Sequence, residues 1–436
     1  MPYGVFRMTG GCPLALFACV TIGFPSHACS EPRFGDSTWV APAGAAEGSA
    51  RAAGPRVAPP DHERGWETAL RTPFRVVFLP FRLLALGIEA SAAFAERSFP
   101  PGTGRTPTWK RWGVSFSPEL IGATASIPHV AGPGSKVALT GTWSPSDNRK
   151  LRLRGYVGQG VSTVGAGAEA LYDYRPSRAF YGIGNFSGSR GTYYLRRTDL
   201  ASVYAFAGQN QLRRARVTLG LSDVAIGNGG KRTPRSIDVF SPANVPFLTR
   251  GSRVWWYGSS ANLGAVDDSL LPAIGVHFRP DVRRYRSSDG TNLRYDQWRL
   301  EARGYLPVFA KRRVLAGRLV YEGVDRRGGS DPVPFYRLPE SSDADRFAAY
   351  GTGRFRDQRL AIGRAEYRWE ILPPLWAVAL GELGEVASTS SRLTLRGAHP
   401  SLGGGLRAKM GNSLARLEIA RGHEGLNIRA DLGVDF

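Results

Sequence analysis

Cysteine is almost absent from this chain of 436 residues. The sequence contains three cysteines, Cys12, Cys19 and Cys29, and all of them lie close to the N-terminus. The rest of the chain has none. A disulfide scaffold and a cysteine-based zinc site are therefore both excluded for everything that follows Cys29.

Long apolar runs are absent as well. The sequence has no run of about eighteen consecutive apolar residues, the length that marks a transmembrane helix, and its mean hydropathy is -0.23. No segment after the N-terminus is therefore predicted to cross a bilayer as a helix. A membrane-spanning strand alternates apolar and polar residues, so its mean hydropathy is also low. A membrane protein built from strands is therefore not excluded.

Acidic residues are scarce relative to basic ones. The chain has 36 aspartates and glutamates against 57 lysines and arginines, a net charge of +21, and 51 of the basic residues are arginine. In a soluble protein this excess suggests nucleic acid, but here basic residues alternate with apolar ones, as in Lys150-Leu151-Arg152-Leu153-Arg154. We expect no nucleic-acid partner, because the inner wall of a barrel or anionic lipid head groups suit this placement better. Codon bias in a GC-rich genome is a second explanation of the arginine excess.

The usual marks of catalysis and of metal or cofactor binding are missing too. The six histidines are scattered without metal-ligand spacing, and neither a Gly-x-Ser-x-Gly elbow nor a phosphate-binding loop occurs. We expect no catalytic residue, no metal, no cofactor and no enzymatic activity. His277 is the best base candidate for a Ser-His lipase assembled across strands, but a histidine that lines an inner wall is the simpler interpretation.

The N-terminal quarter of the chain divides into three segments. An apolar stretch from Cys12 to Phe24 precedes a plausible cleavage site, so residues 1–28 are predicted to be a secretory signal peptide. Residues 29–72, rich in Ala, Pro and Gly, are predicted to be a disordered linker. Residues 73–111 are predicted to hold an amphipathic helix and a linker. That helix either lies on a membrane or in a barrel mouth, or docks on a small soluble domain.

From Trp112 onward, short alternating segments are separated by Gly, Pro, Asn, Asp and Ser. The clearest segment carries apolar residues on one face and charged residues on the other: Gly363, Ala365, Tyr367, Trp369 and Ile371 against Arg364, Glu366, Arg368 and Glu370. This pattern is typical of a wall between lipid and water. Residues 112–436 are predicted to be an all-β, closed antiparallel transmembrane β-barrel of about sixteen strands. Arg364, Glu366 and Arg368 are its predicted charged lumen wall.

Two further features fit a barrel of this kind. Aromatic residues near strand ends are expected to form girdles at the membrane interfaces, and they are Trp143, Trp255, Trp256, Tyr257, Trp369 and Trp376. Three connections, at 176–197, 227–253 and 328–356, are longer than hairpin turns. Long loops on one side and tight turns on the other are expected of outer-membrane barrels.

The last residues of the chain alternate strictly and end on an aromatic. Their apolar face consists of Leu426, Ile428, Ala430, Leu432, Val434 and Phe436, and their polar face of Asn427, Arg429, Asp431 and Asp435. We predict a closing strand that pairs back to the first strand near Trp112. A half-buried strand of a soluble β-sandwich has the same period and is the alternative.

Three patches, in order along the chain, are similar to segments of one known family. The first patch is the stretch from Tyr172 to Asn185. The second consists of residues 334–339, 353–357 and 365–370, and the third of residues 403–407 and 417–425 with the terminal Phe436. They resemble, in turn, the Phe-Tyr-Gly-Ile-Gly-Asn segment, the sixth extracellular loop with its following strand, and the closing hairpin of the BamA/TamA family, also called the bacterial surface antigen family. The resemblance covers roughly residues 112–436.

The resemblance implies a sixteen-stranded outer-membrane barrel whose sixth loop folds back into the lumen. It places the sixth-loop motif at Tyr350, Gly353, Arg354, Phe355, Arg356 and Asp357. In the family, a Val-Arg-Gly-aromatic tetrapeptide sends its arginine to an acidic residue of the inner wall, but the matching positions here are Phe347-Ala348-Ala349-Tyr350. Arg346, Arg354 and Arg356 are candidates to replace that arginine. The family's periplasmic POTRA domains find no credible match before Trp112.

The resemblance favours an integral outer-membrane barrel that assists the assembly of outer-membrane proteins or lipids. A passive, anion-favouring channel or structural surface barrel is the alternative, and a secreted sandwich is the third possibility. We expect a monomer in the bacterial outer membrane, in contact with its lipid and lipopolysaccharide. The resident barrel-assembly machinery is its expected inserter, which reads the terminal strand, here Leu432, Val434 and Phe436, as an assembly signal.

Overall fold

The structure is a computed structural model that describes residues 112–433, apart from gaps at 118–119, 145, 160–162, 211, 231, 269, 310–311, 342–346, 373–374 and 411–412. The signal peptide (1–28), the linker (29–72) and the amphipathic helix with its linker (73–111) lie outside the described residues. So do Val434 and Phe436 of the assembly signal. These assignments stay predictions.

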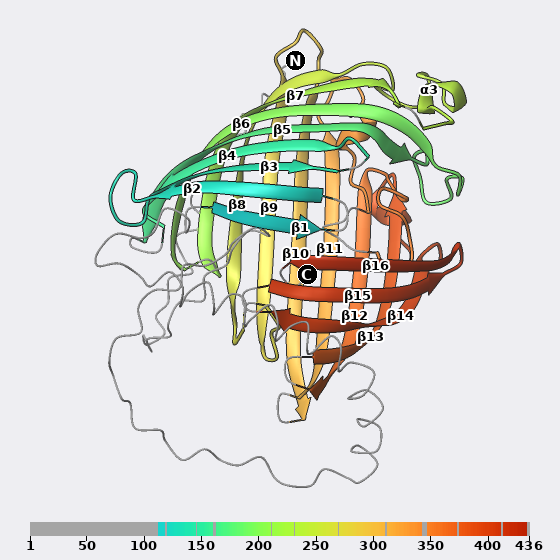
Figure 1. Cartoon of the computed structure of the whole chain (residues 1–436). Coiled ribbons are helices and arrows are strands. Elements are labelled where there is room, and N and C mark those ends of the chain that lie inside the picture. Colours follow the sequence, from blue (N-terminus) through green and yellow to red (C-terminus); the bar gives the residue numbers. More distant parts are fainter. Residues whose placement is uncertain are drawn as a thin grey trace, which may run out of the picture. The chain divides into compact units, whose positions relative to one another are not determined.

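Within the described residues, sixteen strands form one antiparallel sheet in which each strand pairs with the next along the chain (Figure 1). The strands are β1 (Trp112–Ser117), β2 (Leu120–Pro128), β3 (Lys136–Trp143), β4 (Arg149–Val157), β5 (Val164–Phe180), β6 (Thr192–Asn210), β7 (Arg213–Asn228), β8 (Ser252–Val266), β9 (Gly275–Ser287), β10 (Arg294–Phe309), β11 (Arg313–Arg326), β12 (Arg359–Leu372), β13 (Leu375–Ala387), β14 (His399–Met410), β15 (Ser413–Gly422) and β16 (Gly425–Gly433). The predicted all-β antiparallel architecture is confirmed.

Helical structure is confined to short segments within the described ranges. They are α3 (Ser236–Val239), η3 (Phe335–Arg337) and η4 (Ser390–Arg392). None of the helices in this part of the chain has the length and apolar character needed to cross a membrane.

Strand β12 illustrates why the alternating segments form a two-faced wall. Side chains of successive residues point to opposite faces of a sheet, and Arg364, Glu366 and Arg368 accordingly share one buried face while Tyr367 is exposed on the other. We call the buried side of the sheet the inner face and the exposed side the outer face. Ile371, expected on the outer face, is buried instead, because a bulge next to Glu370 shifts the register.

The outer face carries the apolar band that the sequence predicts. Its large exposed side chains include Val203, Val217, Leu219, Leu300, Leu306, Leu315 and Leu319. Trp143 and Tyr257 are exposed on this face, as expected of girdle residues. Trp256 and Trp376, also expected in the girdle, lie on the inner face. Trp256 follows Trp255 directly, so the two side chains point to opposite faces, and Trp376 packs against the buried Tyr305 cluster.

The longest described connections lie at one edge of the sheet, because each of them follows an odd-numbered strand. They run between β5 and β6, β7 and β8, β11 and β12, and β13 and β14. The strands reach further into them than the sequence suggests: β5 continues to Phe180 and β6 begins at Thr192. We call this the loop edge and the opposite one the turn edge.

The first and last strands approach one another without pairing. Parts of β1 and β16 come close together (Figure 1), but no hydrogen-bonded ladder joins them among the described residues. β1 begins at Trp112, which is also the first residue that the structure describes, so the predicted start of the sheet stays a prediction. Closure of the sheet into a barrel, and with it the strand number of a closed barrel, stays a prediction.

Candidate functional site

The connection between β11 and β12, residues 327–358, folds over the inner face and is here called loop 6. Its first limb contains η3, and the ring of Phe335 is fully buried between Phe180 of β5 and Tyr194 of β6, with ring centroids 4.8 and 4.9 Å away. Burying an aromatic side chain of this kind contributes about 1.5–3 kcal/mol. The first limb is therefore anchored to strands far from loop 6 in sequence.

The two limbs of loop 6 are joined by backbone hydrogen bonds. The amide of Ser341 donates to the carbonyl of Phe355 at 3.0 Å, and the amide of Gly353 donates to the carbonyl of Ser341 at 2.6 Å. The amide of Asp357 donates to the carbonyl of Pro339 at 3.2 Å. Gly353 has a φ of 73°, a left-handed conformation that favours glycine. Burial raises the pKa of the Asp357 carboxyl.

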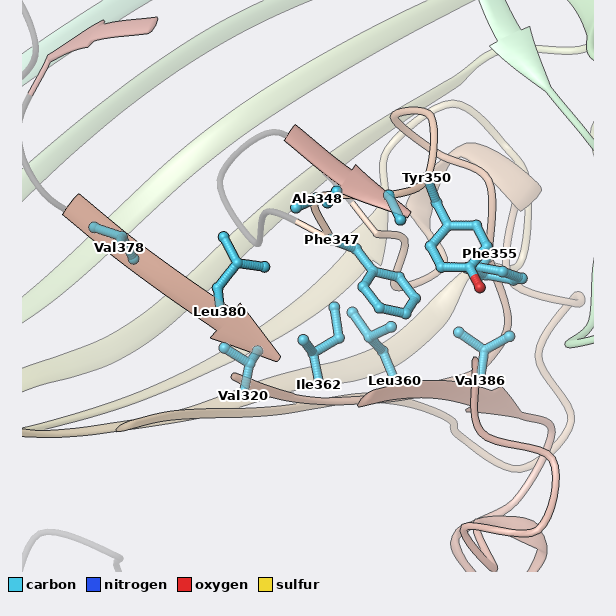
Figure 2. Close-up of a cluster of buried hydrophobic side chains, with 12 residues drawn as sticks. Val320, Phe347, Ala348, Tyr350, Phe355, Leu360, Ile362, Val378, Leu380 and Val386 are labelled. Atoms are coloured by element: carbon cyan, nitrogen blue, oxygen red, sulfur yellow. The ribbon is translucent and has the colours of Figure 1, made fainter. Parts of the chain in front are cut away.

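The tip of loop 6, Phe347 to Tyr350, lies in a buried apolar cluster on the inner face of β11 to β15. The cluster consists of Val320, Phe347, Ala348, Ala349, Tyr350, Phe355, Leu360, Ile362, Val378, Leu380, Val386 and Ala420. Figure 2 shows Phe347 over Leu360 and Ile362, and Tyr350 beside Phe355. Leu360 and Ile362 occupy the same face of β12 as Arg364, so this face changes along the strand from apolar to charged.

Backbone groups of the tip are hydrogen-bonded to two strands, β13 and β16. The amide of Ala348 donates to Oε2 of Glu382 on β13 at 2.6 Å. The side-chain amide of Asn427 on β16 donates to the carbonyl of Ala348 at 2.8 Å, and Arg429 donates to the carbonyl of Tyr350. The polar face of the last strand, which the sequence predicts to face water, thus binds the tip of loop 6.

The hydroxyl of Tyr350 fixes the tip at a third point. It donates to the carbonyl of Pro400 at 3.0 Å and lies 2.7 Å from Nδ1 of His423 in the connection between β15 and β16. Burial raises the pKa of this phenol. Tyr350 therefore stays protonated at neutral pH and keeps its donor.

The arginines of the sixth-loop motif both find acidic partners. Arg356 is buried between the rings of Phe180 and Phe335 and pairs with Glu340, which also pairs with Arg178. Arg354 is buried as well. Its guanidinium pairs with Glu424, with Nε to Oε1 at 2.7 Å, and donates to the side chain and carbonyl of Ser187 at 2.8 Å.

These contacts explain how the loop is held although the family's arginine is missing. At the matching position, Ala348 offers only its backbone amide to Glu382. The guanidinium that meets Glu382 comes from the wall itself, since Nη1 of Arg364 lies 2.8 Å from its Oε1. Of the proposed replacements, Arg354 ties loop 6 to Glu424, Arg356 acts through Glu340 within the loop, and Arg346 lies outside the described residues.

Arg364, Glu366 and Arg368 belong to a larger buried charge network on the inner face. Glu366 accepts from Nε of Arg364 at 2.6 Å and from Nε of Arg368 at 2.8 Å, and Arg407 of β14 lies 2.5 Å from the same carboxylate. Arg364 also pairs with Glu418 of β15 at 2.6 Å. We call these side chains the inner wall network. Glu382 connects it to loop 6.

The sequence predicts only part of this site. Tyr350, Gly353, Arg354, Phe355, Arg356 and Asp357 are brought together, and so are Arg364, Glu366 and Arg368. Leu432 pairs with Ala415 in the sheet. Glu382, Arg407, Glu418, Asn427 and Arg429 are missed; their only signal is a charged or polar residue in an alternating segment.

The antiparallel sheet and the inward-lying loop 6 resemble the fold of outer-membrane β-barrels of the BamA type. BamA is an outer-membrane protein of Gram-negative bacteria, and the resemblance seen in the sequence is borne out at the level of the fold. No protein-family model matches the sequence, and no curated protein matches it.

Solved structures supply the comparison. BamA from Haemophilus ducreyi lacking POTRA domains 1-3 is similar with a TM-score of 0.56 and 14% identity, over 74% of this chain and 68% of that one. CdiB from Acinetobacter baumannii (TM-score 0.46, 11% identity) and CdiB from Escherichia coli (TM-score 0.48, 13% identity) also match. They cover 74% and 73% of this chain, which spans 57% and 59% of theirs.

Proposed function

We propose that the chain is an outer-membrane assembly factor that accepts a strand of another protein at the seam between β1 and β16. The observation that carries this proposal is the pair of adjacent strands without a ladder between them among the described residues. Unpaired strand edges are templates for strand addition. A client strand that pairs with either edge gains backbone hydrogen bonds that the seam itself lacks.

The lengths of the strands support a weak seam. β1 has 6 residues and β16 has 9, whereas β6 has 19. A short strand offers few backbone hydrogen bonds to a partner, so pairing across β1 and β16 is easier to exchange than pairing between long strands such as β5 and β6. Asn427 and Arg429 bind the tip of loop 6, which couples the position of β16 to that of the loop.

The proposal is tested by locking the seam with a disulfide. A cysteine placed at each residue of β1 in turn is combined with Ile428→Cys or Ala430→Cys on β16, and a matched control pair, Ala125→Cys with Leu139→Cys, bridges the paired strands β2 and β3. The natural cysteines all lie at or before Cys29, so they do not compete within the barrel. Each variant replaces the wild-type protein in cells depleted of it.

Depletion is expected to lower the levels of other outer-membrane proteins. The control pair restores these levels in its oxidised form, and a seam-locked variant restores them only after reduction. Unchanged levels on depletion, or full activity of a seam-locked variant, contradict an assembly role. The expected inserter and the monomeric state stay predictions.

A passive anion-favouring channel is the second candidate, and the inner face of β4 to β7 favours it. Basic side chains there outnumber acidic ones: Lys150, Arg152, Arg154, Arg175, Arg196, Arg214 and Arg216 against Glu169 and Asp173. Rings of one charge select ions in pores. Steady anion-selective conductance of purified protein in planar bilayers, unchanged by the seam lock, would favour the channel, whereas a silent membrane counts against it.

A further inference from the structure

The outer face carries a cluster of arginines at the loop edge of β8 to β11. Its members, here called the outer arginine patch, are Arg253, Arg284, Arg286, Arg294 and Arg327. Two aspartates of the outer face lie among them. Asp223 pairs with Arg253 at 2.6 Å, and Asp296 pairs with Arg284 at 2.8 Å and with Arg327 at 2.7 Å.

The other two members of the patch, Arg286 and Arg294, form no ion pair with these aspartates. They stand directly opposite each other in the register of β9 and β10, and both are exposed. No ion pair with a described residue involves either side chain. Residues directly opposite on one face have Cβ atoms about 4.5–5.5 Å apart, and like charges in this position are destabilising. An anion between the two guanidinium groups would remove this cost.

Other outer-face arginines at the same edge follow a different pattern. Arg149 pairs with Asp147 at 2.7 Å and Arg197 with Asp199 at 3.2 Å, and Arg359 pairs with Asp325. Each therefore has an aspartate of its own. The facing pair of Arg286 and Arg294 departs from this one-to-one arrangement, which leaves both guanidinium groups available to a partner from outside the chain.

The neighbours of the pair are those expected at the level of lipid head groups. Trp255 of β8 lies opposite Arg286, and Tyr257 lies opposite Arg284 with its ring 5.8 Å from the guanidinium. The two aromatic rings stack at 5.8 Å. Farther along the outer face of β9, toward the turn edge, come the exposed apolar side chains Val282, Phe278 and Val276. The patch thus sits where the outer face changes from apolar to charged.

An apolar groove begins at the same tryptophan. It has a volume of about 760 Å³, within the usual range for ligand sites. Small side chains form its middle, with Ala170 of β5 opposite Ala201 of β6, and Leu153 and Leu219 are among the larger side chains that line it. These four side chains and Trp255 all point outward.

We propose that the outer arginine patch and this groove bind a phosphorylated lipid of the outer leaflet. A phosphate group bridges Arg286 and Arg294, because guanidinium forks bind phosphate oxygens through paired, charge-assisted hydrogen bonds. An acyl chain of the same lipid lies in the groove beside Trp255. A free phosphate ion would use the arginines alone, so the groove assigns the site to a lipid.

The test compares lipid binding to purified full-length variants in a zwitterionic detergent. Arg286→Gln with Arg294→Gln removes the facing pair. Its control, Arg213→Gln with Arg421→Gln, removes the same charge from outer-face positions that neighbour leucines, Leu263 for Arg213 and Leu402 and Leu426 for Arg421. Native mass spectrometry counts bound diphosphorylated glucosamine lipid (lipid A), its dephosphorylated form, and inorganic phosphate.

The facing-pair variant is expected to bind the diphosphorylated lipid about tenfold more weakly than the wild type or the control, since it loses charge-assisted hydrogen bonds. The dephosphorylated lipid is expected to bind all three proteins equally. Equal binding of the diphosphorylated lipid by the facing-pair variant and the control would overturn the proposal. So would inorganic phosphate that competes as well as the lipid does.

Thermal stability gives a readout that does not depend on mass spectrometry. Without lipid, the facing-pair variant is expected to unfold at the same or a higher temperature than the wild type, because a like-charge contact is gone. With lipid, the wild type and the control gain stability and the variant does not. A groove variant, Ala170→Leu with Ala201→Leu, is expected to lose lipid binding with both arginines in place; full lipid binding by it refutes the groove as the acyl-chain site.

Discussion

The inner wall network and the outer arginine patch place the same kinds of side chain in opposite surroundings. On the inner face, Glu366 meets Arg364, Arg368 and Arg407, and none of the four side chains is more than 1% exposed. On the outer face, Asp296 meets Arg284 and Arg327, whose side chains are 45% and 48% exposed. The two centres differ mainly in how much water remains around the charges.

This difference decides what each centre contributes. A buried charge that loses its partner has no water to replace it, whereas an exposed charge is solvated and screened whether or not it is paired. The inner wall network therefore also fixes the register of β12. A slip by one residue would move Arg364, Glu366 and Arg368 to the outer face.

The strongest test of the comparison removes the central carboxylate of the inner wall network. Glu366→Gln keeps the size of the side chain but leaves three buried arginines around a neutral amide. Breaking a buried ion pair costs about 3–5 kcal/mol, and we expect a loss of that size in the free energy of unfolding. Urea titration of the folded protein in detergent micelles, followed by heat-modifiable migration on gels, measures it.

Glu370→Gln is the control on the same strand. Glu370 is only half-buried and has no ion pair with any described residue, so its replacement is expected to leave the urea midpoint unchanged. If both variants unfold at the same urea concentration, the buried network does not stabilise the sheet in the way the contacts indicate.

Loop 6 lies on the inner face. A substitution that strains its backbone is expected to cause the next largest loss of stability. Gly353→Ala places a side chain on a residue with a φ of 73°, and a left-handed conformation costs about 1–2 kcal/mol for an L-residue. The new Cβ would also lie 3.3 Å from Oε2 of Glu340, the partner of Arg356. We expect faster protease cleavage within loop 6. Gly328→Ala, in the same loop but in open space and without a positive φ, should not change the cleavage rate.

Removal of the Tyr350 hydroxyl tests the contribution of a single uncharged hydrogen-bonding group at the loop tip. Tyr350→Phe keeps the ring in the apolar cluster but removes the bond to Pro400 and the contact with His423. A hydrogen bond of this kind contributes about 1 kcal/mol. Amide hydrogen exchange at Ala348 and Tyr350 is expected to speed up by a corresponding factor. Tyr367→Phe, on the outer face, should leave the exchange of these amides unchanged. Equal exchange rates in both variants would show that the hydroxyl of Tyr350 does not stabilise the loop tip.

The fold follows largely from the period of the sequence. Alternation from Trp112 onward predicts the antiparallel sheet, because strands such as β12 carry charged residues on the inner face and apolar ones on the outer face. Local exceptions escape this reasoning. Ile371 sits at a bulge that depends on the pairing with β13. Trp256 and Trp255 are adjacent, so only one of the two side chains can point to the outer face. Periodicity alone does not say which of two neighbouring tryptophans turns inward.

The site is less predictable because it is made by register and by backbone. Arg364 meets Glu382 and Glu418 only because β12, β13 and β15 align in one way, and the alternating pattern alone does not predict that alignment. At the loop tip, the contact of Ala348 with Glu382 uses a backbone amide. A search of the sequence for a side chain that replaces the family's arginine therefore misses this contact, since every residue except proline carries a backbone amide.

The smallest expected effect comes from the outer counterpart of Glu366. Asp296→Asn removes the carboxylate shared by Arg284 and Arg327, yet exposed ion pairs contribute at most about 1 kcal/mol. We expect the free energy of unfolding to change by less than that in micelles, and the change to shrink further at high salt because the charges are screened. The same urea titration, run beside Glu366→Gln, gives the ratio of the two effects. A loss as large as that of Glu366→Gln would show that water is excluded from the outer face at Asp296, and the contrast between the two regions would then fail.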